Sequence, residues 1–226
     1  QRAMEDACVK PEEIQLVIVG TASSDHAFPS TACLVQDRLG CKNAAAFDLS
    51  AGCSGFVYNL AVASQMIKTG LYDKALIIGA ETLSRIMNFT DRNTCVLFGD
   101  GAGAAVVGVV DEGEGVLGIE LGADGSGGKF LIQPAGGSRK PATPETAAAH
   151  EHTIHMSGQD VFKFAIQIMG TAAKRALKAA DMKAEELDLL VPHQANMRII
   201  TSAAKRLKMP MEKVWVNVDK YANTSA

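Results

Sequence analysis

Two segments far apart in the chain share one residue pattern, and this internal repeat restricts the folds that the sequence can adopt. Residues 10–19 (KPEEIQLVIV) align with residues 183–192 (KAEELDLLVP). Each segment follows a helical pattern, opens with an acidic turn and enters an apolar strand. Each is then followed by a helix, a second strand and a turn of small residues. This matching order and spacing predict two related halves, residues 1–110 and 111–226.

Strand-like and helical patterns alternate along the whole chain. The expected strands are the apolar runs 14–19, 44–49, 75–79, 96–98, 104–110, 116–121, 130–133, 187–191 and 214–218. The expected helices are 1–9, 30–39, 53–69, 161–180 and 196–208. Such alternation is typical of an α/β fold with largely parallel or mixed sheets.

The repeat places Cys53 and Asn223 at equivalent turns, each between a strand and the start of a helix. Cys53 follows Glu13 by 40 positions, and Asn223 follows Glu186 by 37 positions. We expect halves related by pseudo-symmetry to bring these two helix N-termini together, so that both halves contribute to one site.

Cys53 lies among small residues in the segment 47–56 (FDLSAGCSGF). The positive end of a helix dipole and unpaired backbone N–H groups favour a thiolate, which is the nucleophilic form of cysteine. A free cysteine is more often buried and inert. The glycines around Cys53 and the motifs downstream favour the nucleophile here, and we expect the other four cysteines to be inert.

His193 follows an apolar strand in the segment 191–196 (VPHQAN). Pro192 stiffens the exit of that strand and holds the imidazole at the C-terminal edge of a sheet, where ligands of α/β proteins usually bind. A structural histidine is the alternative interpretation. Together with Cys53 and Asn223, His193 gives one nucleophile and two hydrogen-bonding groups, a set suited to thioester chemistry.

Four motifs, in this order along the chain, resemble β-ketoacyl-acyl carrier protein synthase III, one of the thiolase-like condensing enzymes. They are the turn around Cys53, residues 97–104 (LFGDGAGA), residues 192–196 (PHQAN) and residues 223–226 (NTSA). The resemblance runs along essentially the whole chain. It implies an α/β fold of the duplicated, five-layered αβαβα type, and Asn223 in place of a second histidine points to the synthase III branch or its neighbours.

The resemblance also implies the role of each residue in the site. Cys53 would accept an acyl group from acyl-CoA, a substrate thioester, and no separate cofactor is needed. His193 and Asn223 would donate hydrogen bonds to the thioester carbonyl of malonyl-acyl carrier protein during loss of CO₂. Phe98 would orient the resulting carbanion beside Cys53, although an ordinary core phenylalanine is an equally good interpretation of that position.

Further residues are assigned to substrates and to the partner subunit by the same resemblance. Arg92 matches a position near the adenine of coenzyme A, and Asn196 is placed among the substrate-binding residues. Phe28 matches the residue that reaches across a homodimer interface to close the partner's acyl pocket.

A basic face is expected on the helix 196–208. The segment from Asn196 to Lys213 contains five basic residues and one acidic residue, although the net charge of the chain is −3. The resemblance supports a docking surface there for the acidic acyl carrier protein, with a solvated face as the alternative. Its members would be Lys163, Arg198, Lys205 and Arg206.

Other patterns exclude several classes of protein. The net charge argues against a general nucleic-acid binder. The five scattered cysteines contain no CxxC pair, so neither a disulfide framework nor a zinc site is indicated. A reducing, cytoplasmic compartment fits such cysteines best. No apolar run reaches the 18 residues of a membrane span, and no signal peptide is recognisable.

Two weaker patterns resemble ligand sites but do not qualify. Residues 99–103 (GDGAG) suggest a phosphate loop, which requires a helix directly afterwards, whereas residues 104–110 read as a strand. We therefore expect tight backbone turning at these glycines. His150, His152 and His155 have no acidic or cysteine partner at metal-ligand spacing, so no metal is expected.

Both ends of the chain look cut. It does not begin with Met, it opens inside a helical pattern, and residues 223–226 read as the cap and first turn of a helix. We expect a segment of a longer protein that is poorly active and marginally stable by itself. The resemblance implies that a missing glycine-rich loop supplies one oxyanion-hole N–H.

Two alternatives stay open. The first is a neighbouring condensing enzyme, either a polyketide starter synthase or a type III polyketide synthase that uses malonyl-CoA directly. The second is a thiolase-fold fragment without catalytic activity, against which the presence of Cys53, His193 and Asn223 argues.

Overall fold

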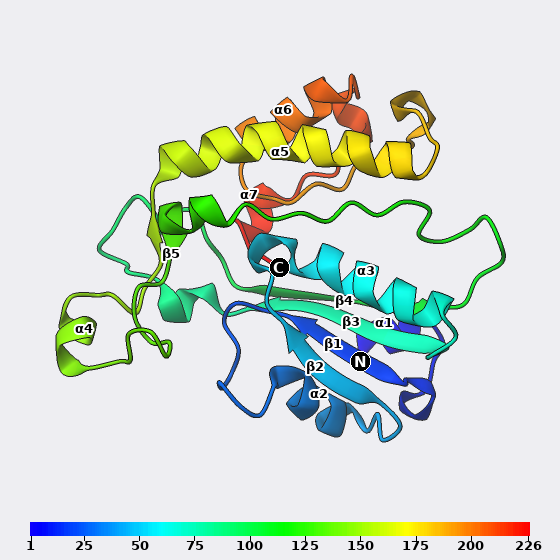
Figure 1. Ribbon diagram of the computed structural model, residues 1–226, viewed down its shortest axis with the longest axis horizontal. Helices are drawn as coiled ribbons and strands as arrows, with labels where there is room; N and C mark the ends of the chain where they lie inside the picture. The colour runs from blue at the N-terminus through cyan, green and yellow to red at the C-terminus, as the bar shows by residue number, and fades with distance from the viewer. The chain divides into compact units, whose positions relative to one another are not determined.

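The computed structural model describes residues 1–226 and divides them into two compact units (Figure 1). Unit 1 comprises residues 1–82, 100–117 and 224–226. Unit 2 comprises residues 83–99 and 118–223. The division of the chain into repeated halves at residue 110 stays a prediction.

Unit 1 is built on a mixed four-stranded sheet with the strand order β2-β1-β3-β4. Its central strand β1 pairs in parallel with β2 and β3, and β4 runs antiparallel to β3. All five residues of β1 are buried, as expected for an apolar run in the middle of a sheet covered on both faces. The strands are β1 (Leu16–Gly20), β2 (Ala45–Leu49), β3 (Lys74–Glu81) and β4 (Gly101–Gly108).

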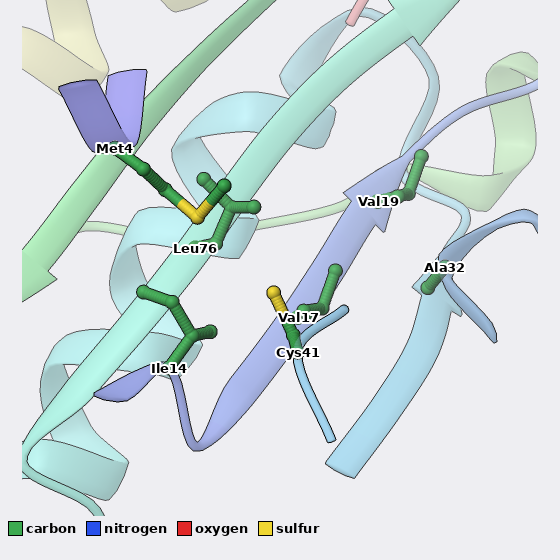
Figure 2. Packing of buried hydrophobic residues seen from close by; sticks show 7 residues of the cluster. All are labelled: Met4, Ile14, Val17, Val19, Ala32, Cys41 and Leu76. Atoms are coloured by element: carbon green, nitrogen blue, oxygen red, sulfur yellow. The ribbon is translucent and has the colours of Figure 1, made fainter. Parts of the chain in front are cut away.

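Side chains of β1 alternate between two hydrophobic clusters on opposite faces of the sheet. Val17 and Val19 face α1 (Arg2–Asp6) and α2 (Thr31–Leu39), where Figure 2 shows them beside Met4, Ala32 and Cys41. Leu16 and Ile18 face the helix α3 (Gly55–Lys68), which packs along β1, β3 and β4. The sheet is therefore a buried layer between helices, which confirms the expected α/β class.

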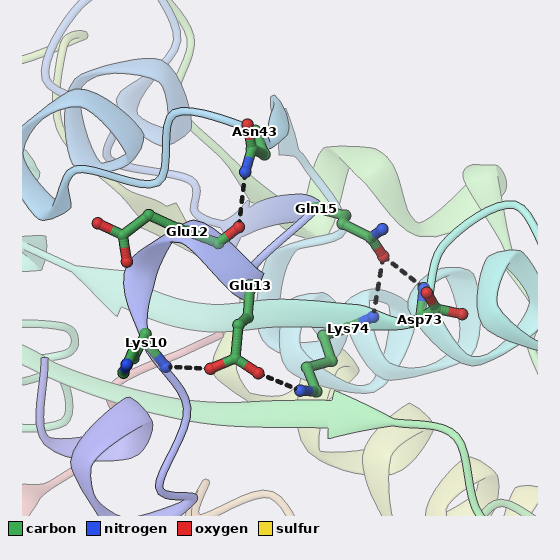
Figure 3. Close-up of polar contacts among 7 residues, drawn as sticks. All are labelled: Lys10, Glu12, Glu13, Gln15, Asn43, Asp73 and Lys74. Carbon is green, nitrogen blue, oxygen red and sulfur yellow. Dashed lines mark hydrogen bonds and ion pairs between the residues drawn. The ribbon is translucent and has the colours of Figure 1, made fainter.

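A polar network joins the beginnings of β1 and β3 at the edge of unit 1 (Figure 3). The Gln15 side-chain oxygen accepts hydrogen bonds from the backbone N–H groups of Asp73 (2.6 Å) and Lys74 (3.3 Å). Lys74 also forms an ion pair with Glu13 at 2.5 Å, which lowers the pKa of Glu13. The pair is exposed, and such pairs contribute little to stability, so we assign the network a role in strand register.

The repeated segments have the same backbone structure. Two residues after the end of the helix that precedes each segment, the backbone has φ of 54°, at Cys8 in unit 1 and at Asp181 in unit 2. Two residues later Lys10 and Lys183 each donate a backbone N–H to the side chain of the third following residue, a glutamate, at 2.9 and 2.7 Å. Each of these lysines is followed directly by a 3₁₀ turn, which is η1 (Pro11–Glu13) in unit 1 and η5 (Ala184–Glu186) in unit 2.

Equivalence of the two segments extends to strand pairing. Val17 lies opposite Ala46 in the parallel pair of β1 and β2. Leu190, which aligns with Val17 in the repeat, forms a parallel bridge with Val214. The internal repeat read from the sequence therefore corresponds to a repeated local structure.

Unit 2 contains the long helix α5 (Gly158–Ala179) packed against α6 (Met197–Arg206). Beneath α6 a small core gathers Ile200, Ala204 and Val214. The remaining elements are η3 (Leu83–Ile86), η4 (Gly125–Phe130), β5 (Leu131–Ile132), α4 (Pro144–Ala148), β6 (His155–Met156), η6 (Met211–Lys213) and α7 (Val218–Tyr221).

Four expected strands are not regular strands. The runs 187–191 and 214–218 are reduced to the bridge between Leu190 and Val214, because two strands without further neighbours pair weakly. In the run 96–98 only Phe98 pairs, with Asn223. The run 116–121 pairs with no strand; its Gly118 packs against Ala176 of α5 and against the C-cap residue Ala180 instead.

Two expected helix starts also differ. The helix expected from residue 53 begins at Gly55, after the 3₁₀ turn η2 (Gly52–Ser54). Residues 223–226 were expected to open a helix and are not helical, with Ser225 at φ of 60°. The Asn223 backbone forms a parallel bridge with Phe98 instead.

Gly118 allows a test of how residues 116–121 are held in unit 2. A Cβ at Gly118 would lie 2.8 Å from the Ala180 backbone nitrogen and against the Ala176 carbonyl oxygen. We expect Gly118→Ala to lower the free energy of unfolding by about 1–3 kcal/mol, the usual cost of overpacking. The control Gly128→Ala adds a methyl group in open space. Chemical denaturation of both variants measures the difference, and equal stability would contradict the packing described here.

Candidate active site

Cys53 lies in the turn η2 (Gly52–Ser54), directly before α3 (Gly55–Lys68). Gly52 has φ of 51°, a left-handed conformation that glycine adopts without strain, and the chain turns there from β2 toward the helix. The Cys53 side chain is half-buried. The Ser54 and Gly55 N–H groups donate to the Ala51 and Gly52 carbonyls within η2, and the thiol lies at the positive end of the α3 dipole.

The start of α3 is held by unusually close backbone packing. A Cβ at Gly20, the last residue of β1, would lie 2.8 Å from the Asn59 side-chain nitrogen and 3.0 Å from the Gly55 carbonyl carbon. A Cβ at Gly55 would lie 2.9 Å from the Ala226 methyl group, and one at Gly79 would lie 3.0 Å from the Ala226 carbonyl. Asn59 also donates a hydrogen bond of 2.9 Å to the carbonyl of Ile78 in β3.

The Cys53 thiol is a weaker acid in this structure than the sequence predicts. Burial raises the pKa of Cys53 above its ordinary value, and the Glu81 carboxylate acts in the same direction. A hydrogen bond from Ser225 to the sulfur lowers the pKa, but it does not offset the burial. Burial therefore opposes the thiolate that the helix N-terminus favours.

Glu81 is the residue that reasoning from the sequence missed. It lies at the end of β3, is 4% exposed, and accepts hydrogen bonds from Thr21 Oγ1 (3.3 Å), the Ala22 backbone N–H (3.1 Å) and Ser23 Oγ. A buried carboxylate persists only with such partners. The available signal was an acidic residue two positions after the end of the apolar run 75–79.

His193 lies just beyond the bridge between Leu190 and Val214 in unit 2 and is half-buried. Burial lowers the pKa of His193 below its ordinary value. The imidazole is therefore neutral at pH 7, with one ring N–H to donate and one ring nitrogen to accept.

Asn223 and Phe98 are brought together in unit 2 by a parallel bridge. The Asn223 backbone N–H donates to the Leu97 carbonyl, and the Gly99 N–H donates to the Asn223 carbonyl, both at 3.0 Å. Asn223 is 8% exposed. The Phe98–Asn223 pair fixes the expected amide donor beside the phenylalanine that was expected to act with it.

Two glycines of the segment 99–103 allow the chain near Asn223 to pack closely against this segment. A Cβ at Gly99 would lie 2.5 Å from the Tyr221 carbonyl oxygen, and in unit 1 a Cβ at Gly101 would lie 2.8 Å from Thr224 Cγ2. None of these glycines has a positive φ, and β4 already begins at Gly101. The expectation of tight turning is therefore wrong, and close packing of the C-terminal segment explains Gly99 and Gly101.

The other residues expected to bind substrate occupy varied positions. Phe28 is 86% exposed, and Arg92 is exposed in a turn. The Asn196 side chain accepts a hydrogen bond of 3.1 Å from the Ile199 N–H and caps α6. This capping bond engages the side-chain oxygen of Asn196.

An open groove of about 420 Å³ runs along α6. Arg198 and Lys205 line it with Met197, Thr201 and Ser202. The predicted carrier-protein residues Lys163 and Arg206 are exposed but do not line this groove. The stem of Arg206 packs over Gly170 of α5.

Several other findings bear on the site. No group of three or more His, Cys, Asp or Glu side chains is placed to hold a metal ion. None of the helices is long and apolar enough to cross a membrane. Cys53, Glu81 and Ser225 belong to unit 1, whereas Phe98, His193 and Asn223 belong to unit 2.

Comparison with known proteins identifies the family. Models of 3-oxoacyl-[acyl-carrier-protein] synthase III match residues 47–125, and those of its C-terminal region match residues 177–226. The β-ketoacyl-[acyl-carrier-protein] synthase III of Caldanaerobacter subterraneus subsp. tengcongensis is 59% identical over 226 residues, which are all of this chain and 68% of that protein. The chain belongs to the 3-oxoacyl-[acyl-carrier-protein] synthase III family.

Solved structures agree with this assignment. The synthase III of Aquifex aeolicus VF5 superposes with a TM-score of 0.88 at 43% identity, covering 99% of this chain and 68% of that one. The priming β-ketosynthase of the R1128 polyketide pathway has a TM-score of 0.85 at 34% identity, covering 99% and 65%. The fold is thus thiolase-like, and the chain is a condensing acyltransferase that initiates type II fatty acid synthesis.

The opposing effects on Cys53 can be tested by chemical modification. We expect Glu81→Gln to lower the pKa of Cys53, because the charge that opposes the thiolate is removed, and Ser225→Ala to raise it. The pH dependence of iodoacetamide alkylation at Cys53, followed by peptide mapping, measures both shifts. Glu12→Gln, which removes an exposed carboxylate, is the matched control and leaves the pKa of Cys53 unchanged. An unshifted profile in Glu81→Gln would mean that its charge does not act on the thiol.

Proposed function

We propose that Cys53 is the nucleophile that accepts the acyl group, and that His193 and Asn223 support the condensation step. The Cys53 sulfur attacks the carbonyl carbon of acyl-CoA, the bond to the coenzyme A sulfur breaks, and coenzyme A leaves with the thiol proton. The position of Cys53 directly before α3 carries this proposal, because the positive end of the helix dipole there stabilises the negative charge that forms on the carbonyl oxygen.

In the second step malonyl-acyl carrier protein loses CO₂, and its electron pair moves onto the thioester carbonyl as an enolate. His193 and Asn223 donate hydrogen bonds to that oxygen. The enolate carbon then attacks the acyl group on Cys53, the carbon–sulfur bond breaks, and the released thiolate takes a proton from solvent. The lowered pKa of His193 supports this role, because a neutral donor loses no proton to the enolate oxygen.

Chain connectivity supports a common site for these groups. Ser225, which hydrogen-bonds to Cys53, follows Asn223 by two residues in the sequence. Phe98 pairs with Asn223 and would orient the carbanion. We assign Asn196 and Arg92 to the substrate side, with Arg92 near the coenzyme A adenine.

The partners are proposed on the same basis. The exposed Phe28 would reach into the acyl pocket of a second copy in a homodimer. The groove lined by Arg198 and Lys205 would bind acidic acyl carrier protein. The basic side chains of Lys163 and Arg206 would add to its positive charge. Both substrates are cytoplasmic metabolites or carriers, and we place the protein in the cytoplasm with no metal or other cofactor.

Separate half-reactions test the catalytic roles. We expect His193→Ala and Asn223→Ala to retain transfer of the acyl group from acetyl-CoA to Cys53. Decarboxylation of malonyl-acyl carrier protein should fall by about 10²–10³-fold, the usual effect of removing one oxyanion donor. Mass spectrometry of Cys53 and release of labelled CO₂ measure the two steps. Loss of acylation with decarboxylation intact would reverse the assignment.

Charge reversal tests the docking surface. We expect Arg198→Glu and Lys205→Glu to raise KM for malonyl-acyl carrier protein, most strongly at low salt, where screening is weak. Acylation by acetyl-CoA should not change. Lys42→Glu, on an exposed loop of unit 1, is the matched control. Equal losses with both substrates would show that these charges support the fold or the coenzyme A entrance.

A further inference from the structure

Gln194 has every hydrogen-bonding position of its carboxamide occupied. Its nitrogen donates to the carbonyls of Pro192 (3.0 Å) and Trp215 (3.1 Å). Its oxygen accepts from the backbone N–H groups of Asn217 (2.9 Å) and Val218 (3.1 Å). A carboxamide has two donor hydrogens and two acceptor lone pairs, and all four are used within unit 2.

These bonds continue the strand pairing where the backbone stops. Leu190 and Trp215 form the last backbone bond of that pairing, with Trp215 donating to Leu190 at 2.8 Å. Beyond it, His193 leaves one strand and Asn217 leaves the other. The Gln194 side chain bridges the gap between the two strand exits.

One end of this bridge lies next to His193, and the other leads to Asn223. The Pro192 carbonyl belongs to the peptide bond that enters His193. Asn217 and Val218 begin α7 (Val218–Tyr221), which ends two residues before Asn223. The Gln194 oxygen therefore supplies the acceptor for backbone N–H groups at the start of α7.

We propose that Gln194 is a positioning residue that holds His193 and Asn223 at a fixed separation for the enolate oxygen. This inference rests on the roles proposed above for those two residues. No other side chain meets the same demands: glutamate lacks the donors, methionine lacks donors and acceptors, and asparagine is shorter by one methylene group.

The test compares Gln194→Met, which is neutral and of similar shape, with Gln194→Glu, which keeps the acceptor oxygen. In Gln194→Met we expect decarboxylation of malonyl-acyl carrier protein to fall by roughly 10–10²-fold, as misplacement of about 1 Å does elsewhere. Acyl transfer from acetyl-CoA to Cys53 should be unchanged. Amide hydrogen exchange at Asn217 and Val218 should become faster, because both lose their acceptor.

Gln194→Glu tests the donor end and the acceptor end of the bridge separately. It is also the second variant to use if Gln194→Met does not fold. It should keep Asn217 and Val218 protected from exchange but lose decarboxylation, because a carboxylate repels the Pro192 carbonyl. Gln133→Met is the matched control, since exposed Gln133 donates one hydrogen bond to the His152 carbonyl of unit 2. It should leave both half-reactions and the exchange of Asn217 unchanged.

Two results would overturn the inference: full decarboxylation by Gln194→Met, or equal losses of acyl transfer and decarboxylation, as for a purely structural role. Failure of the proposed function is distinguishable. It would appear as absent decarboxylation in the unsubstituted protein, which would remove the catalytic part of the inference. Exchange at Asn217 and Val218 would still support or refute Gln194 as the cross-link between the strand exits.

Discussion

The start of α3 depends on the absence of side chains at three positions. Gly20, Gly55 and Gly79 let the end of β1, the helix and residue Ala226 approach to distances that a Cβ would forbid. Backbone packing of this kind fixes the turn η2 more tightly than side-chain packing could, because no rotamer can adjust. The position of the Cys53 sulfur follows from that contact, and so does the placement of Ser225 against it.

The same contact explains the mixed electrostatics around Cys53. Close packing removes water from the thiol, and this burial raises its pKa more than the hydrogen bond of Ser225 lowers it. Glu81 is buried nearby because Thr21, Ala22 and Ser23 satisfy its carboxylate. A raised pKa lowers the fraction of thiolate, which is the form of cysteine that is oxidised.

Much of unit 1 could be predicted from the sequence, because apolar runs such as residues 14–19 become strands wherever neighbours cover them. The runs around Leu190 and Val214 have the same local preference but form one bridge, since regular pairing depends on further strands. Cys53 and His193 could be singled out by their turns. Glu81 and Gln194 could not, because their importance lies in contacts with residues distant in the sequence. The glycines of residues 99–103 were misinterpreted for the same reason.

Alignment of the repeat shows how two similar segments came to do different work. Gly20 aligns with His193, and Thr21 aligns with Gln194. In unit 1 the first position has no side chain, which leaves room for the start of α3, and Thr21 bonds to Glu81. In unit 2 the first position holds the imidazole, and Gln194 bonds to the next strand exit. At both strand exits the residue that follows, Thr21 after Gly20 and Gln194 after His193, forms polar cross-links. One local backbone structure therefore supports the proposed nucleophile in unit 1 and its proposed hydrogen-bond donors in unit 2, and the difference lies in which position keeps a side chain.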